Sequence, residues 1–121
     1  MNFMTNLWNQ FEGICSVPHP SGHLDGMREY IIGVAKENGL TPEVDEAGNV
    51  LVRIPASVGK EDSPVVVLEA HMDMVPQKTK ESEHNFETDP LDVYIDGEWV
   101  TARNTTLGAD DGMGMAIALA V

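Results

Sequence analysis

Histidine and aspartate, two common metal-ligand types, stand together in one short segment of this sequence. The segment His71-Met72-Asp73 follows an apolar run at residues 65–68 that predicts a β-strand. Residues two positions apart on an extended chain point to the same face, so we expect the side chains of His71 and Asp73 to lie together. In open α/β sheets, ligands bind beyond the carboxyl ends of the strands, where this pair falls. The pair is either a metal ligand with its orienting carboxylate or a hydrogen-bonded histidine at a strand end, because His-x-Asp alone is common.

A second group of polar residues precedes the last apolar segment. It places two adjacent carboxylates, Asp110 and Asp111, at the start of a predicted helix, with glycines at positions 108, 112 and 114. Aspartate in such a position usually caps the helix by accepting hydrogen bonds from first-turn N–H groups. Capping needs one carboxylate, however, and the glycines permit unusual backbone angles and close approach to a ligand. Capping and ligand binding both remain open on these residues alone.

The rest of the sequence predicts the elements that position these groups. Apolar side chains recur at helical spacing over residues 5–16 and again from about Asp25, with Gly39 as the C-terminal cap of the second helix. Two prolines within residues 17–22 break the helical pattern between them. Turn residues at 47–49 and at Asp96-Gly97 predict two β-hairpins. The core face of the first helix is expected to consist of Leu7, Trp8, Phe11, Ile14 and Cys15.

Two apolar segments predict the interior of the domain. Residues 65–68 are apolar without interruption, which predicts a central parallel strand covered on both faces. Residues 112–121 are apolar nearly all round, which predicts a buried helix. Such a helix needs cover on every side, and we therefore expect the chain to be an incomplete part of a larger domain.

Composition excludes several classes of partner. Seven basic residues face 20 acidic ones, for a formal net charge of −13, so a nucleic acid or an anionic membrane surface would be repelled. The single cysteine, Cys15, cannot form an intrachain disulfide and is expected to be inert packing. The sequence has no apolar stretch long enough to span a bilayer and no recognisable signal peptide. The cytoplasm is the expected location.

Taken together, the segments resemble the aminoacyl-histidine (Xaa-His) dipeptidases, a family of dinuclear zinc metallopeptidases. The resemblance extends over essentially all 121 residues and includes the connector Pro18-His19-Pro20-Ser21-Gly22. The other matching motifs, in chain order, are His71-Met72-Asp73-Met74-Val75, His84-Asn85-Phe86 with Asp89-Pro90, Ile95-Asp96-Gly97 with Trp99, and Thr105-Thr106-Leu107-Gly108-Ala109-Asp110. The resemblance implies an α/β fold in which residues 1–121 are the N-terminal portion of a three-layer αβα catalytic domain of the zinc-exopeptidase type.

The same resemblance implies a role for each candidate site residue. His71 would ligate one of two zinc ions, Asp110 would bridge both, and Asp73 would be the catalytic carboxylate that orients His71. Two zinc ions lower the pKa of a shared water from about 15.7 toward about 7, so that a zinc-bound hydroxide can attack a peptide carbonyl. A cis peptide bond is implied between Asp110 and Asp111. The family's general base, the first of a Glu-Glu pair, and its remaining metal ligands have no counterpart in this chain.

Three positions depart from the family pattern. Pro76-Gln77 stands where many relatives have Cys-Glu, Asp111 where they often have Asn, and Asn104 where Gly is usual. Asparagine tolerates a positive φ angle better than most residues, so we expect the loop at Asn104 to be preserved. The remaining histidines are expected to be loop or surface groups: His19, His23 and His84.

The predicted function is hydrolysis of Xaa-His dipeptides by a longer parent protein, whose partners are short peptides and, as an open alternative, a second copy of itself. A tripeptidase or an N-acyl amino acid deacylase of the same set is the alternative enzyme. A non-catalytic module that kept the fold is the alternative from another class, although it would have no reason to retain His71, Asp73 and Asp110. The chain alone is expected to bind zinc weakly and to show no turnover.

Overall fold

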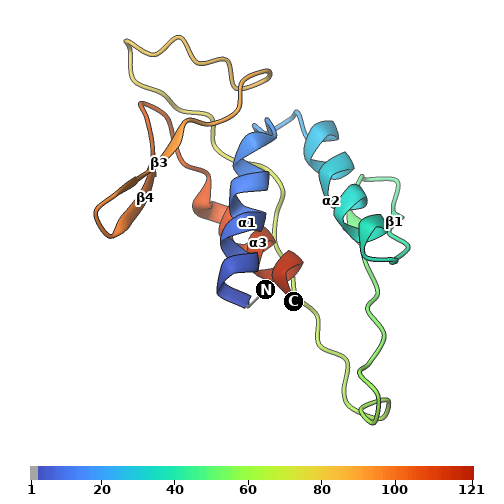
Figure 1. The fold of residues 1–121 in the computed structure, drawn as a ribbon. Helices are drawn as coiled ribbons and strands as arrows, with labels where there is room; N and C mark the ends of the chain where they lie inside the picture. The colour runs from blue at the N-terminus through green and yellow to red at the C-terminus, as the bar shows by residue number, and fades with distance from the viewer. Residues whose placement is uncertain (1–2) are drawn as a thin grey trace.

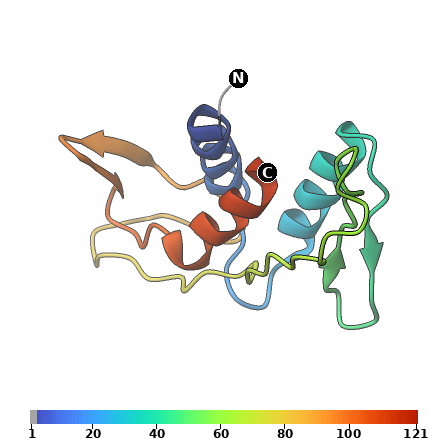
Figure 2. The ribbon, with the colours of Figure 1, turned by 90° about the horizontal axis from the view of Figure 1, so that it is seen from below.

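The computed structural model describes residues 3–121 as a mixed α/β arrangement of helices and two-stranded sheets (Figure 1). In chain order, the elements are α1 (Phe3–Ser16), α2 (Asp25–Glu37), β1 (Glu43–Val44), β2 (Val50–Leu51), β3 (Val93–Asp96), β4 (Trp99–Ala102) and α3 (Ala109–Ala120). The pair α1 and α3 forms the centre, with α2 and the β1–β2 hairpin on one side and the β3–β4 hairpin on the other (Figures 1 and 2). No helix within residues 3–121 combines the length and the apolar character needed to cross a bilayer.

The hydrophobic core lies mainly between α1 and α3. The side-chain amide of Asn6 on α1 donates a hydrogen bond of 3.0 Å to the carbonyl of Ala120 near the end of α3. Burial raises the pKa of the Cys15 thiol to about 12, with Glu12 adding a smaller effect, so the thiol stays protonated as the packing group that we expected. The buried core consists of Leu7, Phe11, Ile14, Cys15, Met27, Met115, Ala116 and Ala120.

The prediction for Trp8 is wrong. Its side chain is 42% exposed and packs edge-on against Phe11, with ring centroids 6.1 Å apart, at the rim of an open hollow of about 630 Å³ between α1 and the β3–β4 hairpin. The reason is that α3 covers only one side of α1, and Trp8 lies on the adjoining side. The other four residues of the predicted face are buried as expected.

The end of α2 confirms the predicted glycine cap. Gly39 follows the C-cap residue Asn38 and has a φ of +73°. Its N–H donates to the carbonyl of Lys36 at 3.0 Å, and the N–H of Leu40 donates to the carbonyl of Ala35 at 2.9 Å. This is the Schellman pattern, which satisfies the last carbonyls of the helix and requires a left-handed residue at the glycine position.

Both predicted hairpins form. The strands β1 and β2 pair in antiparallel register with Glu43 opposite Leu51. In the second hairpin Asp96 pairs with Trp99, so the two loop residues are Gly97 and Glu98, one position later than the sequence suggested. Gly97, at the first loop position, has a φ of +60°. A glycine with positive φ at that position is typical of a type II′ turn, whose twist matches that of the strands.

The central strand predicted at residues 65–68 does not form within the described part of the chain. The chain between β2 and residue 70 runs away from the helices as a long loop (Figure 1). Val65 is 91% exposed and Leu68 is 52% exposed, and neither belongs to a strand. Strands are stabilised by hydrogen bonds to neighbouring strands, and no strand among residues 3–121 flanks this run.

Helix α3 is regular from Gly112, where the sequence predicts it to begin, and it is buried on one side only. The N-cap residue is Gly108, and Asp110 and Asp111 have non-helical backbone angles and a cis peptide bond between them, as the resemblance implied. Ile117 is 43% exposed and Val121 is 76% exposed, so the expectation of burial all round is wrong for the described residues. The cause is that α1 is the main element that packs on α3 here, and it covers one face.

Asn104 adopts the left-handed backbone conformation that the sequence predicted, with a φ of 59°. Its carbonyl also accepts a hydrogen bond of 3.0 Å from the N–H of Thr79. A side chain with a β-carbon costs roughly 1–2 kcal/mol in this region, and asparagine tolerates it best. We expect Asn104→Ala to lower the free energy of unfolding by about 1 kcal/mol, whereas Asn104→Gly should leave it unchanged or raise it slightly. Urea unfolding followed by circular dichroism measures both variants. Equal stabilities of the alanine and glycine variants would show that the backbone angle is not what asparagine provides.

Candidate metal centre

The segment that carries His71 and Asp73 is fixed by the connector between α1 and α2. Met74 is 2% exposed, and its N–H donates to the carbonyl of His19 at 3.0 Å, while its carbonyl accepts from the N–H of Ser21 at 3.1 Å. These bonds form a parallel bridge between Pro20 and Met74. The bridge fixes the backbone immediately after Asp73.

The loop before α3 pairs with the other end of the same segment. The hydroxyl of Thr106 donates to the carbonyl of Val75 at 2.6 Å, and its N–H donates to the carbonyl of Gln77 at 2.8 Å. Gly108 has a φ of +74°, and a β-carbon there would meet the Met74 side chain at 3.1 Å. The glycine therefore permits both the turn and the close approach of the loop to the segment that ends in Val75.

These two sets of contacts bring the predicted site residues together. The Nε2 atom of His71 lies 2.9 Å from Oδ1 of Asp110, although the residues are 39 positions apart. The Nδ1 atom of His71 faces Asp73, at 3.0 Å from its carbonyl oxygen and 3.1 Å from its Oδ1 atom. The backbone N–H of His71 donates to Oδ2 of Asp111 at 3.3 Å. The imidazole thus lies between the two predicted carboxylates, one at each ring nitrogen.

Electrostatics in the cluster follow from these contacts. The hydrogen bond with Asp110 raises the pKa of the His71 imidazole, and the neighbouring Asp73 adds to this effect. A hydrogen bond from the Ser21 hydroxyl is the main cause that lowers the pKa of the Asp73 carboxyl. Asp73 is therefore anionic at neutral pH. All three side chains are largely accessible to solvent, which keeps their interaction energies small in this form.

The donor atoms fit a zinc ion in type and in arrangement. With Nδ1 hydrogen-bonded to Asp73, the imidazole can present Nε2 as the ligand, and Asp110 presents carboxylate oxygens to the same space. Donor atoms of a tetrahedral zinc ion lie about 3.4 Å apart, so this exposed pair would need to separate by only about 0.5 Å. Within residues 3–121, no group of three or more His, Cys, Asp or Glu side chains is arranged to hold a metal ion. The described chain therefore supplies two donors and their orienting groups.

The chain was compared with protein families, curated proteins and solved structures. No protein-family model matches the chain. The chain is 58% identical over 115 residues to the cytosol non-specific dipeptidase of Escherichia coli strain K12. The aligned region covers 95% of this chain and 24% of that protein. The crystal structure of aminoacylhistidine dipeptidase from Vibrio alginolyticus superposes with a TM-score of 0.92 at 49% identity, over 99% of this chain and 25% of that one.

This chain is homologous to the aminoacyl-histidine dipeptidases. The superposition also confirms the predicted α/β fold as part of the dipeptidase structure. The chain spans about a quarter of the length of both relatives. The assignment of residues 1–121 to the N-terminal portion of a catalytic domain stays a prediction.

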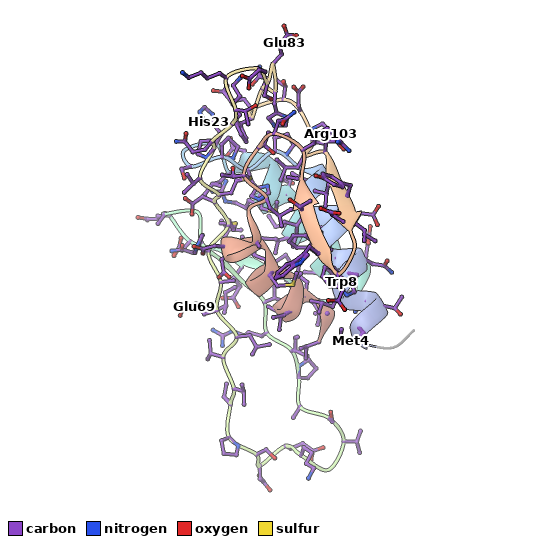
Figure 3. All side chains as sticks on the ribbon, turned by 90° about the vertical axis from the view of Figure 1, so that its left-hand side faces the viewer. Met4, Trp8, His23, Glu69, Glu83 and Arg103 are labelled. Carbon is purple, nitrogen blue, oxygen red and sulfur yellow. The ribbon has the colours of Figure 1, made fainter. Side chains whose placement is uncertain are left out.

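The remaining histidines lie outside the cluster. His19 lies in a loop as predicted, but it is not at the surface: it is 2% exposed, and Nδ1 lies 2.6 Å from the carbonyl oxygen of Val17. Burial lowers the pKa of His19, so the ring is neutral at pH 7. His23 is a surface group as predicted, 3.3 Å from Glu87, at an edge of the molecule away from the β3–β4 hairpin (Figure 3). His84 packs against Phe86 with ring centroids 4.5 Å apart.

Two contacts to the cluster were not predicted from the sequence. Ser21 donates a hydrogen bond to Asp73, and Asp111 accepts one from the backbone of His71. Ser21 belongs to the connector that resembles the dipeptidases, but no role was assigned to it from the sequence. Asp111 was considered as a capping or ligand-binding carboxylate, but its contact with the His71 backbone was not predicted. The long-range pairing that creates both contacts is not visible in local sequence.

Proposed function

We propose that the full-length protein that contains this chain is a dinuclear zinc dipeptidase, and that Xaa-His dipeptides are its leading substrates. The observation that carries the proposal is the convergence of His71 Nε2 and Asp110 Oδ1, with Asp73 at the opposite ring nitrogen. An aspartate that only caps the helix would stand at the N-cap position, but that position is Gly108, and the Asp110 carboxylate contacts Nε2 of His71 instead. The homology to two dipeptidases supports the same conclusion.

Each carboxylate around His71 has a definite role in the proposed site. Asp73 accepts the Nδ1 proton of His71, which fixes the ring and leaves Nε2 free to bind a cation. Asp110 has two carboxylate oxygens and so can serve two cations about 3.5–4 Å apart. Asp111 holds the backbone of His71 beside the start of α3. When bound, a pair of zinc ions supplies a hydroxide nucleophile at neutral pH and polarises the substrate carbonyl.

The chain provides only a share of the proposed site. Zinc sites normally have at least three protein ligands per ion, and the described residues bring two donors together. We therefore propose that the other ligands and the general base come from elsewhere in the full-length protein. The 121-residue chain alone should bind zinc weakly and should not turn over. The net charge of −13 favours cations over nucleic acids or anionic membranes as partners. The name of the E. coli relative supports a cytoplasmic location.

A broader dipeptidase is the second candidate. It is favoured by the name of the E. coli relative, which describes a non-specific dipeptidase. The two candidates differ in substrate breadth, which is measured on the full-length protein.

The decisive experiment compares the full-length protein with the 121-residue chain. Zinc content is measured by elemental analysis after zinc titration, and hydrolysis is measured on a Xaa-His dipeptide, a matched dipeptide without histidine, a tripeptide and an N-acyl amino acid. We expect two zinc ions and preferential Xaa-His cleavage for the full-length protein. Equal cleavage of both dipeptides would support the broader enzyme, and cleavage of only the tripeptide or the N-acyl amino acid would replace both. A full-length protein without zinc binding and without hydrolysis would leave only the non-catalytic module.

A further inference from the structure

Ser21 makes the shortest side-chain contact to the candidate metal centre. Its Oγ donates a hydrogen bond of 2.5 Å to Oδ2 of Asp73, across 52 positions of sequence. The other oxygen of the same carboxylate, Oδ1, lies 3.1 Å from Nδ1 of His71. One carboxylate group therefore joins the serine hydroxyl to the imidazole, with a separate oxygen for each.

The backbone around Ser21 holds its hydroxyl in place. The N–H of Ser21 donates to the carbonyl of Met74 at 3.1 Å, and the carbonyl of His19 accepts from the N–H of Met74 at 3.0 Å. His19 and Met74 are each 2% exposed, so the connector is anchored in the interior on both sides of the parallel bridge. The hydroxyl is thus presented by a fixed backbone, while the Ser21 side chain itself lies at the surface.

A carboxylate without such a contact would be free to turn. The terminal torsion of aspartate is broad, and Asp73 is only partly buried, so packing alone does not fix the plane of its carboxylate. A hydrogen bond to an ionised oxygen is about twice as strong as one between neutral groups. The serine hydroxyl therefore selects one orientation of the carboxylate, and that orientation places Oδ1 against the imidazole.

We propose that Ser21 is a positioning residue, whose hydroxyl fixes the Asp73 carboxylate so that it holds the His71 imidazole with Nε2 toward Asp110. This inference rests on the proposed function for its consequence in catalysis, but the positioning itself is a property of the metal-free chain. The connector between α1 and α2 thereby acts on a metal ligand that it does not touch.

The test uses three variants of the full-length protein. Ser21→Ala removes the hydroxyl, Ser21→Thr retains it, and Thr88→Val removes the hydroxyl of a matched exposed pair, in which Thr88 Oγ1 lies 3.2 Å from Asp89 Oδ1. Loss of a group that bonds a metal ligand directly typically lowers metal affinity or activity about 10- to 100-fold, and Ser21 acts one contact further out, through Asp73. We expect Ser21→Ala to lower zinc affinity and kcat by about 10-fold, the low end of that range, with KM little changed. Ser21→Thr should restore both, and Thr88→Val should match the parent protein.

A second measurement separates this inference from the proposed function. Side-chain ¹⁵N spectra of metal-free protein report the tautomer of His71 at a pH where the ring is neutral. The Asp73 and Asp110 carboxylates compete for the single proton of the neutral ring, so we expect the parent protein to show both tautomers and Ser21→Ala to shift the balance toward the Nε2–H form. An unchanged His71 spectrum in Ser21→Ala would overturn the positioning role. Absence of zinc binding and hydrolysis in the parent protein, with the tautomer change present, would overturn the proposed function alone.

Discussion

Asp110→Asn is expected to lower kcat/KM of the full-length protein for Xaa-His dipeptides by at least about 10³-fold, because an amide offers one neutral oxygen where the proposed pair of zinc ions would take an anionic carboxylate. The structure supports this choice of residue. Asp110 is the carboxylate that meets Nε2 of His71 at 2.9 Å, and its side chain is 96% exposed, so its replacement removes no packing. Steady-state kinetics with zinc in excess measure the loss.

The matched control for Asp110 is Asp96→Asn. Asp96 is also an exposed aspartate, and it lies in β3, which takes no part in the cluster. It should retain the kcat/KM of the parent protein, and the thermal unfolding of both variants should be similar. If Asp110→Asn kept more than about a tenth of the activity, the bridging role of this carboxylate would be excluded.

His71→Ala has the second largest expected effect, and it is measured on metal content. Structural zinc sites bind with about 10–16 kcal/mol shared among four ligands, or about 3 kcal/mol per ligand. Loss of the imidazole should therefore weaken binding of one zinc ion by about 10²- to 10³-fold. At zinc concentrations that saturate the parent protein with two ions, the variant should retain one. Competition with a chromophoric chelator measures the affinity.

His23→Ala is the control for His71. His23 is an exposed histidine whose ring lies 3.3 Å from Glu87, and it has no contact with the cluster. It should bind two zinc ions with unchanged affinity. Two tightly bound ions in His71→Ala as well would show that the imidazole is not a ligand, and the convergence of His71 with Asp110 would then be an ordinary hydrogen bond.

Several local features could be predicted from the sequence because neighbouring residues decide them. The glycine cap at Gly39, both hairpins and the positive φ of Asn104 depend on backbone preferences of single residues, and all are present. The same holds for the chemistry of the site. Imidazole and carboxylate groups two positions apart on an extended segment, His71 and Asp73, do face each other.

Other features depended on which surfaces meet in three dimensions. The exposure of Trp8 and of one face of α3 follows from how α1 and α3 pack. The run at residues 65–68 forms no strand because no strand among residues 3–121 lies beside it. The burial of His19 follows from its place in the connector beside Met74. Amphipathic spacing identifies an apolar face, but it does not identify what covers that face.

Residue types and short spacings in the sequence determined which groups are available for metal binding and which turns connect the elements. Tertiary structure decided that Asp110, 39 positions from His71, meets it at 2.9 Å, and that Ser21, 52 positions from Asp73, fixes its carboxylate. The physical reason is that dihedral preferences act within a few residues, whereas contacts between distant segments depend on the packing and backbone pairing of the whole chain.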